Sequence, residues 1–267
     1  MNILDKIIAH KKREIVQQQQ ITKIEELKQT EHFNRKTLSL TDFLLRKNKS
    51  GIIAEFKRKS PSKGFINASA DVQTVTKTYS LAGSSGISVL TDYEFFGGNN
   101  QDLLKTREVN KTPILRKDFI ISEYQIYEAK SIGADVILLI AAALNPDELK
   151  HFTKLAHTLG LEVLLEIHSE EDLQPAIAAQ PDLIGVNNRN LKTFKTSLDV
   201  SRKLISQIPE NIMAVSESGI SDPTSIMELK KLGYKGFLIG ENFMRTADPG
   251  KAAAEFMQQL SKLETHA

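Results

Sequence analysis

The segment Gly51-Ile-Ile-Ala-Glu-Phe-Lys-Arg-Lys-Ser-Pro-Ser-Lys-Gly64 begins as a short apolar strand and ends as a basic loop rich in Ser, Pro and Gly. Side chains alternate between the two faces of a strand, so Glu55 and Lys57 share one face and Phe56 lies on the other. Buried ions cost free energy unless they are paired. Taken alone, Glu55 and Lys57 favour a structural ion pair, and the rest of the chain has to decide whether they belong to a site.

After Gly51 the sequence alternates between short runs rich in Ile, Val and Leu and amphipathic stretches of helical period, as in a chain of βαβ units. The predicted strands are Ile52–Phe56, Ile87–Leu90, Thr112–Leu115, Val136–Ile140, Glu162–Ile167, Leu183–Val186, Ile212–Val215 and Phe237–Ile239. The predicted helices are Val72–Ala82, Asn100–Asn110, Glu123–Ile132, Pro146–Leu159, Ser169–Ala179, Leu198–Gln207, Pro223–Leu232 and Lys251–Leu263.

Eight unbroken strand–helix units predict an α/β protein with a closed (β/α)8 TIM barrel. An open doubly wound sheet would need a Gly-rich phosphate fingerprint after its first strand, and neither Gly-x-Gly-x-x-Gly nor Gly-x4-Gly-Lys-Ser/Thr occurs in the sequence. We therefore expect one domain over residues 1–267, with a barrel at 49–267.

Residues 1–48 are predicted to form an N-terminal helical extension that packs on the barrel. Residues 2–16 have a stripe at helical spacing, which is made of Leu4, Ile7, Ile8, Lys11 and Ile15. A further short helix is predicted at Ser39–Leu45. Nothing in this extension resembles a catalytic segment.

Composition places the chain among soluble globular enzymes. Its 267 residues are 40% hydrophobic and 25% charged, and the net charge of +2 gives no reason to expect nucleic acid or an anionic membrane as a partner. The chain has no Cys, which excludes disulfides, a thiolate nucleophile and Cys-based metal sites. The longest apolar run, Val136–Leu144, is well short of the ~20 residues of a membrane span. We expect a cytoplasmic protein with no secretion signal.

Polar residues follow seven of the eight predicted strands, and the active site of a TIM barrel forms at these carboxyl ends. They are Glu55 and Lys57, Thr91 and Asp92, Arg116 to Asp118, Glu166 and His168, Asn187 to Arg189, Ser216 to Gly219, and Gly240 to Asn242. Accidental ion pairs would not gather at one rim. The pattern predicts a catalytic mouth.

The same mouth is predicted to bind phosphate. TIM barrels commonly hold phosphate on backbone N–H groups after strands 7 and 8, where this chain has Ser218-Gly219 and Gly240-Glu241. Glycine lets the backbone approach an anion closely. The carboxylate of Glu241 would repel phosphate, so we expect its backbone N–H to serve while its side chain turns away. Further charge and a hydroxyl are available from Lys57, Ser60 and Arg189.

Seven motifs, in order from strand 1 to strand 8, resemble the indole-3-glycerol phosphate synthase family of tryptophan biosynthesis. They are Ile53-Ala-Glu-Phe-Lys-Arg-Lys-Ser-Pro-Ser62; Ser88-Val-Leu-Thr-Asp92 with Phe95-Phe96-Gly97-Gly98; Leu115-Arg-Lys-Asp-Phe-Ile120; Leu164-Leu-Glu-Ile-His168; Gly185-Val-Asn-Asn-Arg-Asn-Leu191; Ser216-Glu-Ser-Gly-Ile220; and Leu238-Ile-Gly-Glu-Asn242. The N-terminal helical extension is also similar to the family's.

This resemblance implies a cofactor-free carboxy-lyase without a metal. It would convert 1-(2-carboxyphenylamino)-1-deoxyribulose 5-phosphate into indole-3-glycerol phosphate with loss of CO2 and water. It further implies a phosphorylated small-molecule substrate, no nucleic-acid or membrane partner, and a monomer, with association with other tryptophan-pathway enzymes left open.

The resemblance also implies a role for each matching residue. Lys117 would be the general acid of ring closure, helped if burial or a neighbouring lysine lowers its pKa. Lys57, expected across the mouth, would hold the substrate carboxylate and assist the dehydration, and Glu166 would be the general base. Glu55 would orient the lysines, Asn187 and Glu217 would surround the hydroxyls and amine, and Phe96 would pack the anthranilate ring. The phosphate would be held by Ser60, Arg189, Ser218, Gly219 and Gly240.

Other interpretations stay open for single residues and for the whole chain. His168 follows Glu166 closely, but the resemblance gives it no chemical role, and Asp92 and Asp118 favour structural ion pairs. An isomerase or a Schiff-base aldolase acting on a sugar phosphate would also want a lysine such as Lys117 at a strand end. A barrel that only binds a phosphorylated metabolite is a further alternative. A metal-dependent hydrolase is disfavoured, because the sequence has no His/Asp cluster with ligand spacing.

Overall fold

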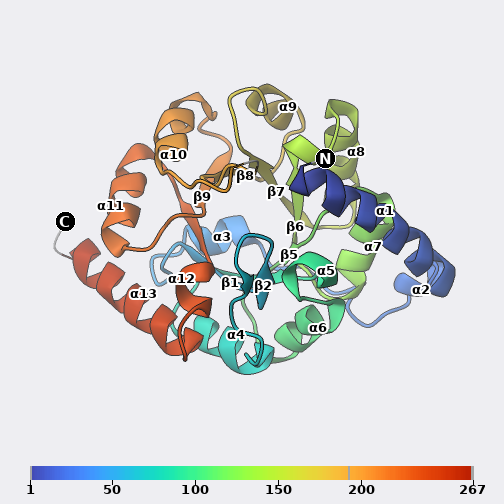
Figure 1. Cartoon of the computed structure of the whole chain (residues 1–267), viewed down its shortest axis with the longest axis horizontal. Coiled ribbons are helices and arrows are strands. Elements are labelled where there is room, and N and C mark those ends of the chain that lie inside the picture. Colours follow the sequence, from blue (N-terminus) through green and yellow to red (C-terminus); the bar gives the residue numbers. More distant parts are fainter. Residues whose placement is uncertain (1, 192, 266–267) are drawn as a thin grey trace.

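A computed structural model of the chain describes residues 2–191 and 193–265. Eight parallel strands close into a barrel in the order β1-β10-β9-β8-β7-β6-β5-β4, and the helices surround it (Figure 1). The predicted (β/α)8 TIM barrel is confirmed. The expected domain limits at residues 1 and 267 lie outside the described residues.

The barrel strands are β1 (Ile52–Phe56), β4 (Gly86–Leu90), β5 (Ile114–Lys117), β6 (Val136–Ile140), β7 (Glu162–Ile167), β8 (Leu183–Asn187), β9 (Met213–Glu217) and β10 (Gly236–Ile239). A separate hairpin pairs β2 (Lys59–Ser60) with β3 (Gly64–Phe65). The helices of the barrel are α4 (Val72–Leu81), α5 (Tyr93–Phe96), α6 (Asn100–Val109), α7 (Glu123–Ser131), η1 (Ala141–Ala143), α8 (Pro146–Thr158), α9 (Leu173–Ala178), α10 (Asp199–Leu204), η2 (Ile205–Gln207), α11 (Pro223–Leu232), α12 (Glu241–Met244) and α13 (Pro249–Thr265). Before the barrel come α1 (Ile3–Ile21), α2 (Ile24–Leu27) and α3 (Leu40–Leu44).

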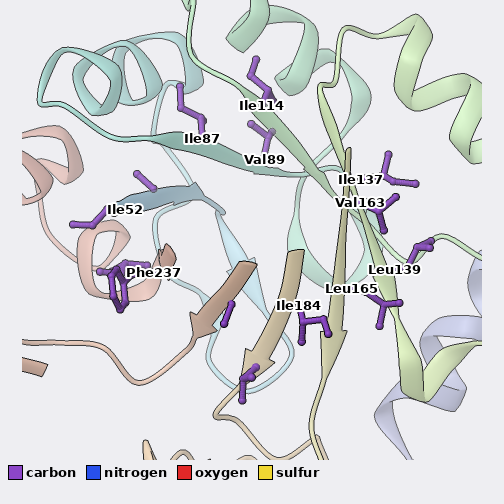
Figure 2. Close-up of a cluster of buried hydrophobic side chains, with 14 of the residues drawn as sticks. Ile52, Ile87, Val89, Ile114, Ile137, Leu139, Val163, Leu165, Ile184 and Phe237 are labelled. Carbon is purple, nitrogen blue, oxygen red and sulfur yellow. The ribbon is translucent and has the colours of Figure 1, made fainter. Parts of the chain in front are cut away.

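Strand alternation divides the core into two parts. Outward-facing strand residues pack beneath the helices in one large buried cluster, and Figure 2 shows ten of them with labels, among them Ile52, Val89 and Leu165. Their strand neighbours Ile53, Leu115 and Leu164 belong to a second cluster that fills the barrel interior. Residues that follow these inward positions by two, such as Glu55, therefore face the mouth of the barrel.

The segment before the barrel is tied to the end of the barrel where the strands begin. The carboxylate of Glu162, at the start of β7, accepts hydrogen bonds from the backbone N–H of Leu40 (2.7 Å) and Thr41 (3.1 Å) at the start of α3. This places Leu40 and Leu44 of α3 in the interior cluster. An acidic side chain at a helix N-terminus also stabilises the helix by its charge.

Helix α1 is fastened at the other end, beside α7 (Figure 1). Its Lys11 is only 1% exposed, and Lys11 Nζ lies 3.0 Å from Asp92 Oδ2 and 3.1 Å from Asp118 Oδ1. Asp92 follows β4 and Asp118 follows β5. The apolar stripe predicted for this helix is thus completed by a buried ammonium.

Short elements account for most differences from the predicted helices. The predicted helix Ser169–Ala179 begins only at Leu173, because the Asp172 carboxylate accepts the backbone N–H groups of His168 (2.8 Å) and Ser169 (3.0 Å) and holds a turn there. The β2–β3 hairpin, α5 and α12 were not predicted, since segments of two to four residues give no periodic signal.

Candidate active site

A cavity of about 610 Å³ opens at the carboxyl ends of the strands. Cavities of this size suit a small-molecule ligand. Its walls include every residue that the sequence assigned to catalysis or substrate binding: Glu55, Lys57, Ser60, Phe96, Lys117, Glu166, Asn187, Arg189, Glu217, Ser218, Gly219, Gly240 and Glu241. The predicted mouth is therefore one space.

Lys117 is the centre of the polar wall. It ends β5, and its Nζ lies 2.7 Å from Glu166 Oε2 of β7 and 3.1 Å from Glu217 Oε2 of β9. Glu166 and Glu217 are 3% and 1% exposed. Three ionisable groups, from strands far apart in the sequence, thus share one nearly dry space, where charges interact strongly.

The protonation of these three groups is linked. Burial alone would lower the pKa of Lys117, but the carboxylates of Glu166 and Glu217 outweigh burial and raise that pKa. Burial would raise the pKa of Glu166, yet the Lys117 ammonium, with a smaller contribution from His168, holds it well below its usual range. For Glu217, burial prevails over Lys117, and the neighbouring Glu166 adds to it, so its pKa is raised to about 8.

One expectation for Lys117 was therefore wrong. A neighbouring lysine or burial was expected to lower its pKa, whereas two carboxylates raise it. These carboxylates lie 49 and 100 residues further along the chain, so local sequence could not indicate the direction.

Lys57 and Glu55 form the second part of the polar wall. Lys57 Nζ lies 2.6 Å from Glu55 Oε1, as a pair on one face of β1 predicts. Gly240 follows β10 and lies against this pair, because a Cβ there would come within 2.4 Å of Glu55 Oε1. Lys57 was expected across the mouth from Lys117. This was wrong, because only β4 separates β1 from β5 around the barrel.

Asn187 connects the acid–base groups to the phosphate side of the cavity. Its side chain hydrogen-bonds to Glu166, and its Oδ1 accepts the backbone N–H of Arg189 at 3.0 Å. On the same strand, Gly185 leaves room for Glu217, since a Cβ at this glycine would lie 2.0 Å from Glu217 Oε1.

The predicted phosphate residues gather where the loops after β8, β9 and β10 meet the β2–β3 hairpin. The hydroxyl of Ser60 is buried and has no hydrogen-bond partner among the described residues. Ser218 and Gly219 have φ values of +68° and +78°, so the chain turns here and does not continue the strand. Backbone N–H groups in such turns can bind an anion. These features suit an anion.

The side chain of Glu241 was expected to turn away from this region. It does not. Its Oε2 lies 2.9 Å from Arg189 Nη2, while Arg189 Nη1 donates to Ser62 Oγ at 2.9 Å. The guanidinium relieves the repulsion that the sequence argument assigned to this carboxylate. Arg189 thereby joins three loops of the rim.

The opposite wall is apolar. The rings of Phe96 and Phe119 lie 5.9 Å apart and are tilted by 37°. Ile3, Leu4 and Ile7 of α1 also line the cavity. Sequence reasoning missed this contribution, because an apolar stripe predicts packing without saying which surface it covers.

Some polar residues at the strand ends do not contact Lys117, Glu166 or Glu217. Asp92 and Asp118 pair with Lys11, as the structural interpretation expected. Within residues 2–191 and 193–265, no group of three or more His, Asp or Glu side chains could hold a metal ion, and no helix is long and apolar enough to span a membrane.

Known proteins resemble this chain over most of its length. A family model described as indole-3-glycerol phosphate synthase matches residues 4–256. A protein of that name from Bacteroides thetaiotaomicron is 48% identical over 260 residues, covering 97% of this chain and 99% of the relative. Another, from Caldanaerobacter subterraneus subsp. tengcongensis, is 43% identical, covering 97% of this chain and 98% of the relative.

Solved structures with low identity share the fold alone. The 3-hexulose-6-phosphate synthase of Salmonella typhimurium superposes with a TM-score of 0.63 at 12% identity, covering 79% of this chain and 98% of that one. A thiamine phosphate pyrophosphorylase from Pyrococcus furiosus gives 0.58 at 15% identity, covering 79% and 95%.

Proposed function

Because the chain belongs to the indole-3-glycerol phosphate synthase family, it is a carboxy-lyase of tryptophan biosynthesis, and we propose that its barrel mouth performs the reaction with Lys117 as general acid. The reaction turns 1-(2-carboxyphenylamino)-1-deoxyribulose 5-phosphate into indole-3-glycerol phosphate, CO2 and water. The observation that carries the proposal is the contact of Lys117 Nζ with two buried carboxylates.

Ring closure needs a proton at the ketone oxygen while the aryl carbon attacks the ketone carbon. The raised pKa keeps Lys117 protonated at neutral pH, so the proton is present before substrate arrives. The developing alkoxide is more basic than an amine and can draw this proton from a high-pKa ammonium. The aryl carbon then loses CO2 and regains its aromatic ring.

Dehydration needs a base as well as an acid. Glu166, whose pKa is lowered, is ionised at neutral pH, and as the general base it takes a proton from the ring carbon beside the nitrogen. Lys57 holds the substrate carboxylate and assists the departure of water, and Glu55 orients its ammonium at 2.6 Å. Asn187 and Glu217 surround the hydroxyls and amine.

Substrate orientation follows from the two ends of the cavity. The apolar wall accepts the anthranilate ring, with Phe96 against it. The phosphate lies at the other end, where the buried free hydroxyl of Ser60 supports an anion site. Arg189 supplies charge, and Ser218, Gly219, Gly240 and Glu241 supply backbone groups. The phosphate then binds to the Arg189 guanidinium in place of part of its contact with the Glu241 carboxylate.

The same argument extends to organisation and location. We propose that residues 1–48 and 49–267 fold as one unit, supported by the buried Lys11 pairs and by the Arg35–Asp135 ion pair of 2.7 Å. We also propose a cytoplasmic monomer, in keeping with a biosynthetic enzyme whose chain has no Cys. Association with other enzymes of the pathway stays a proposal.

A Schiff-base aldolase is less well supported. Imine formation needs a neutral amine, whereas the carboxylates around Lys117 favour its ammonium form. Borohydride with substrate would trap an imine on Lys117 in an aldolase and leave the protein unmodified in the proposed reaction.

The deciding experiment is a turnover assay. Purified protein with EDTA should convert the carboxyphenylamino-deoxyribulose phosphate into a product with indole fluorescence. Glu166→Gln should lose roughly 10²- to 10⁴-fold in kcat while keeping its fold. Absence of product, or an absolute metal requirement, would contradict the proposal. Normal turnover by Glu166→Gln would remove only Glu166 from its role.

A further inference from the structure

Glu166 has a second neighbour in addition to Lys117. His168 follows it by two residues, directly after β7 ends at Ile167, and its ring lies beside the Glu166 carboxylate. His168 Nε2 lies 3.2 Å from Glu166 Oε1, whereas Lys117 Nζ lies 2.7 Å from the other oxygen, Oε2. Each oxygen of the candidate base therefore faces a different nitrogen.

His168 lies next to Glu166 but does not form part of the cavity wall. It is not among the described residues that line the cavity. Its backbone N–H donates to Asp172 Oδ2 at 2.8 Å, which fixes the residue at the start of the turn after β7. Its side chain is 13% exposed. A substrate in the cavity would meet Glu166 first.

The imidazole has little else to bind. Both ring nitrogens are buried, and neither has a hydrogen bond to another described residue, so the 3.2 Å contact with Glu166 Oε1 is the polar contact that the ring makes. Buried polar groups are normally hydrogen-bonded, and one that is not deserves an explanation. A small rotation of either side chain would turn this contact into a charge-assisted hydrogen bond.

We propose that His168 is a positioning residue, which donates from Nε2 to Glu166 Oε1 and keeps Oε2 directed at Lys117 and the substrate. This inference rests on the proposed role of Glu166 as general base. A carboxylate with a free oxygen can rotate about its last bond, and rotation would remove the base from its proton. The imidazole fixes that rotation and, when protonated, favours the ionised carboxylate.

Other groups also face Glu166. From β5 comes Lys117 on Oε2, and from β9 comes Glu217, whose raised pKa lets it hold a proton beside Glu166. Asn187 of β8 adds an amide hydrogen bond. From β6, Ile140 pairs with Glu166 in register and is apolar. Asp172, behind His168, is committed to backbone N–H groups.

The test compares His168→Leu, which removes the donor, with His168→Gln, which can return an N–H to a similar position. We expect kcat of His168→Leu to fall roughly tenfold with KM nearly unchanged, because the lost hydrogen bond involves a charged group. His168→Gln should recover most of that loss. The exposed His151 provides the control, and His151→Leu should behave as the unchanged protein.

Two further readouts separate positioning from a structural role. The acidic limb of the kcat/KM profile should move to higher pH in His168→Leu, because Glu166 loses a favourable neighbour. In a double-mutant cycle, His168→Leu should cost little when added to Glu166→Gln, since it acts through Glu166. Equal kcat for the Leu and Gln variants, or full additivity with Glu166→Gln, would overturn the inference.

The proposed function can fail separately. If the unchanged protein makes no indole product, the family's reaction fails here. If the unchanged protein makes the product and Glu166→Gln loses activity, the proposed function holds. The His168 variants then test the further inference alone. Should His168→Leu not fold, His168→Gln is compared directly with the unchanged protein, and a large loss of kcat in it would overturn the inference.

Discussion

Two buried charge clusters lie on opposite faces of β5, and consecutive residues of this strand supply both. Lys117 faces inward to Glu166 and Glu217, which we call the inner cluster. Arg116 and Asp118 belong to the outer cluster, which lies beneath the helices and also contains Lys11, Asp92 and Glu128. β5 and the residue after it thus contribute the proposed general acid to one cluster and an attachment point for α1 to the other.

The clusters differ in the direction in which the pKa of a buried carboxyl group is shifted. In the outer cluster, Asp118 Oδ1 lies 3.1 Å from Lys11, and Asp118 Oδ2 accepts from Thr91 Oγ1 at 2.6 Å and lies 3.3 Å from Arg116. Arg116 also reaches Glu128 at 2.5 Å. Against burial, these cations hold the pKa of Asp118 below its usual range. Such a network resists proton exchange.

The inner cluster has two carboxyl groups for one cation and the outer cluster has three for two, so each has one carboxyl group in excess. Glu217 Oε1 is buried without a hydrogen-bond partner among the described residues, and the pKa of Glu217 is raised. A carboxyl group whose pKa is raised towards neutral pH can take up and release a proton, and such groups cluster at functional sites. We therefore propose that the inner cluster serves the reaction, while the outer cluster attaches α1 to the barrel.

Lys117→Met should have the largest effect and should act on turnover alone. A general acid is typically worth roughly 10²- to 10⁴-fold, so we expect kcat to fall by that factor. The fold should persist, because Glu217 already holds its proton readily and one carboxylate can become neutral. Indole fluorescence measures turnover, and circular dichroism reports the fold. Loss of the fold with activity would mean that the inner cluster is structural as well.

Lys11→Met should show the reverse pattern. It leaves Asp92 and Asp118 buried with one cation fewer, and breaking a buried pair typically costs about 3–5 kcal/mol. We expect the free energy of unfolding in urea to fall by about that amount. KM should rise, because α1 carries Leu4 and Ile7 of the cavity wall. By contrast, kcat should stay close to its original value.

The neighbouring Lys12 is exposed, so Lys12→Met is the matched control and should leave both quantities unchanged. Unchanged stability in Lys11→Met with a large loss of kcat would erase the distinction between the clusters.

Periodicity predicted the face of each side chain but not its partner. It placed Glu55 and Lys57 together, gave β1 and α11 their bounds, and put Lys11 on the buried stripe of α1. It could not show that Lys11 meets Asp92 and Asp118, because that depends on where the helix docks.

The electrostatic consequences were equally beyond a local pattern. The raised pKa of Lys117 comes from strands that closure of the barrel brings together. The Arg189–Glu241 pair likewise joins loops that follow β8 and β10. Strand ends therefore predicted which residues line the cavity, while the protonation of these residues required the packed barrel.

Glu217→Gln should produce the smallest effect, a change in how stability depends on pH. The folded pKa of Glu217 is about 8, above its usual unfolded value of about 4.3. Between these values the folded protein holds a proton that the unfolded chain releases. The free energy of unfolding should therefore fall as pH rises, by up to about 1.4 kcal/mol per pH unit for this group.

The other two members of the inner cluster do not mask this slope between pH 5.5 and 7.5. Glu166, with its lowered pKa, is ionised in both states there, and Lys117, with its raised pKa, is protonated in both. Urea unfolding at these two pH values should show that Glu217→Gln gains stability relative to the unchanged protein as pH rises. Glu210→Gln, at an exposed carboxylate, should show no such gain. Parallel pH dependence in all three proteins would mean that the pKa of Glu217 is not raised in the folded protein.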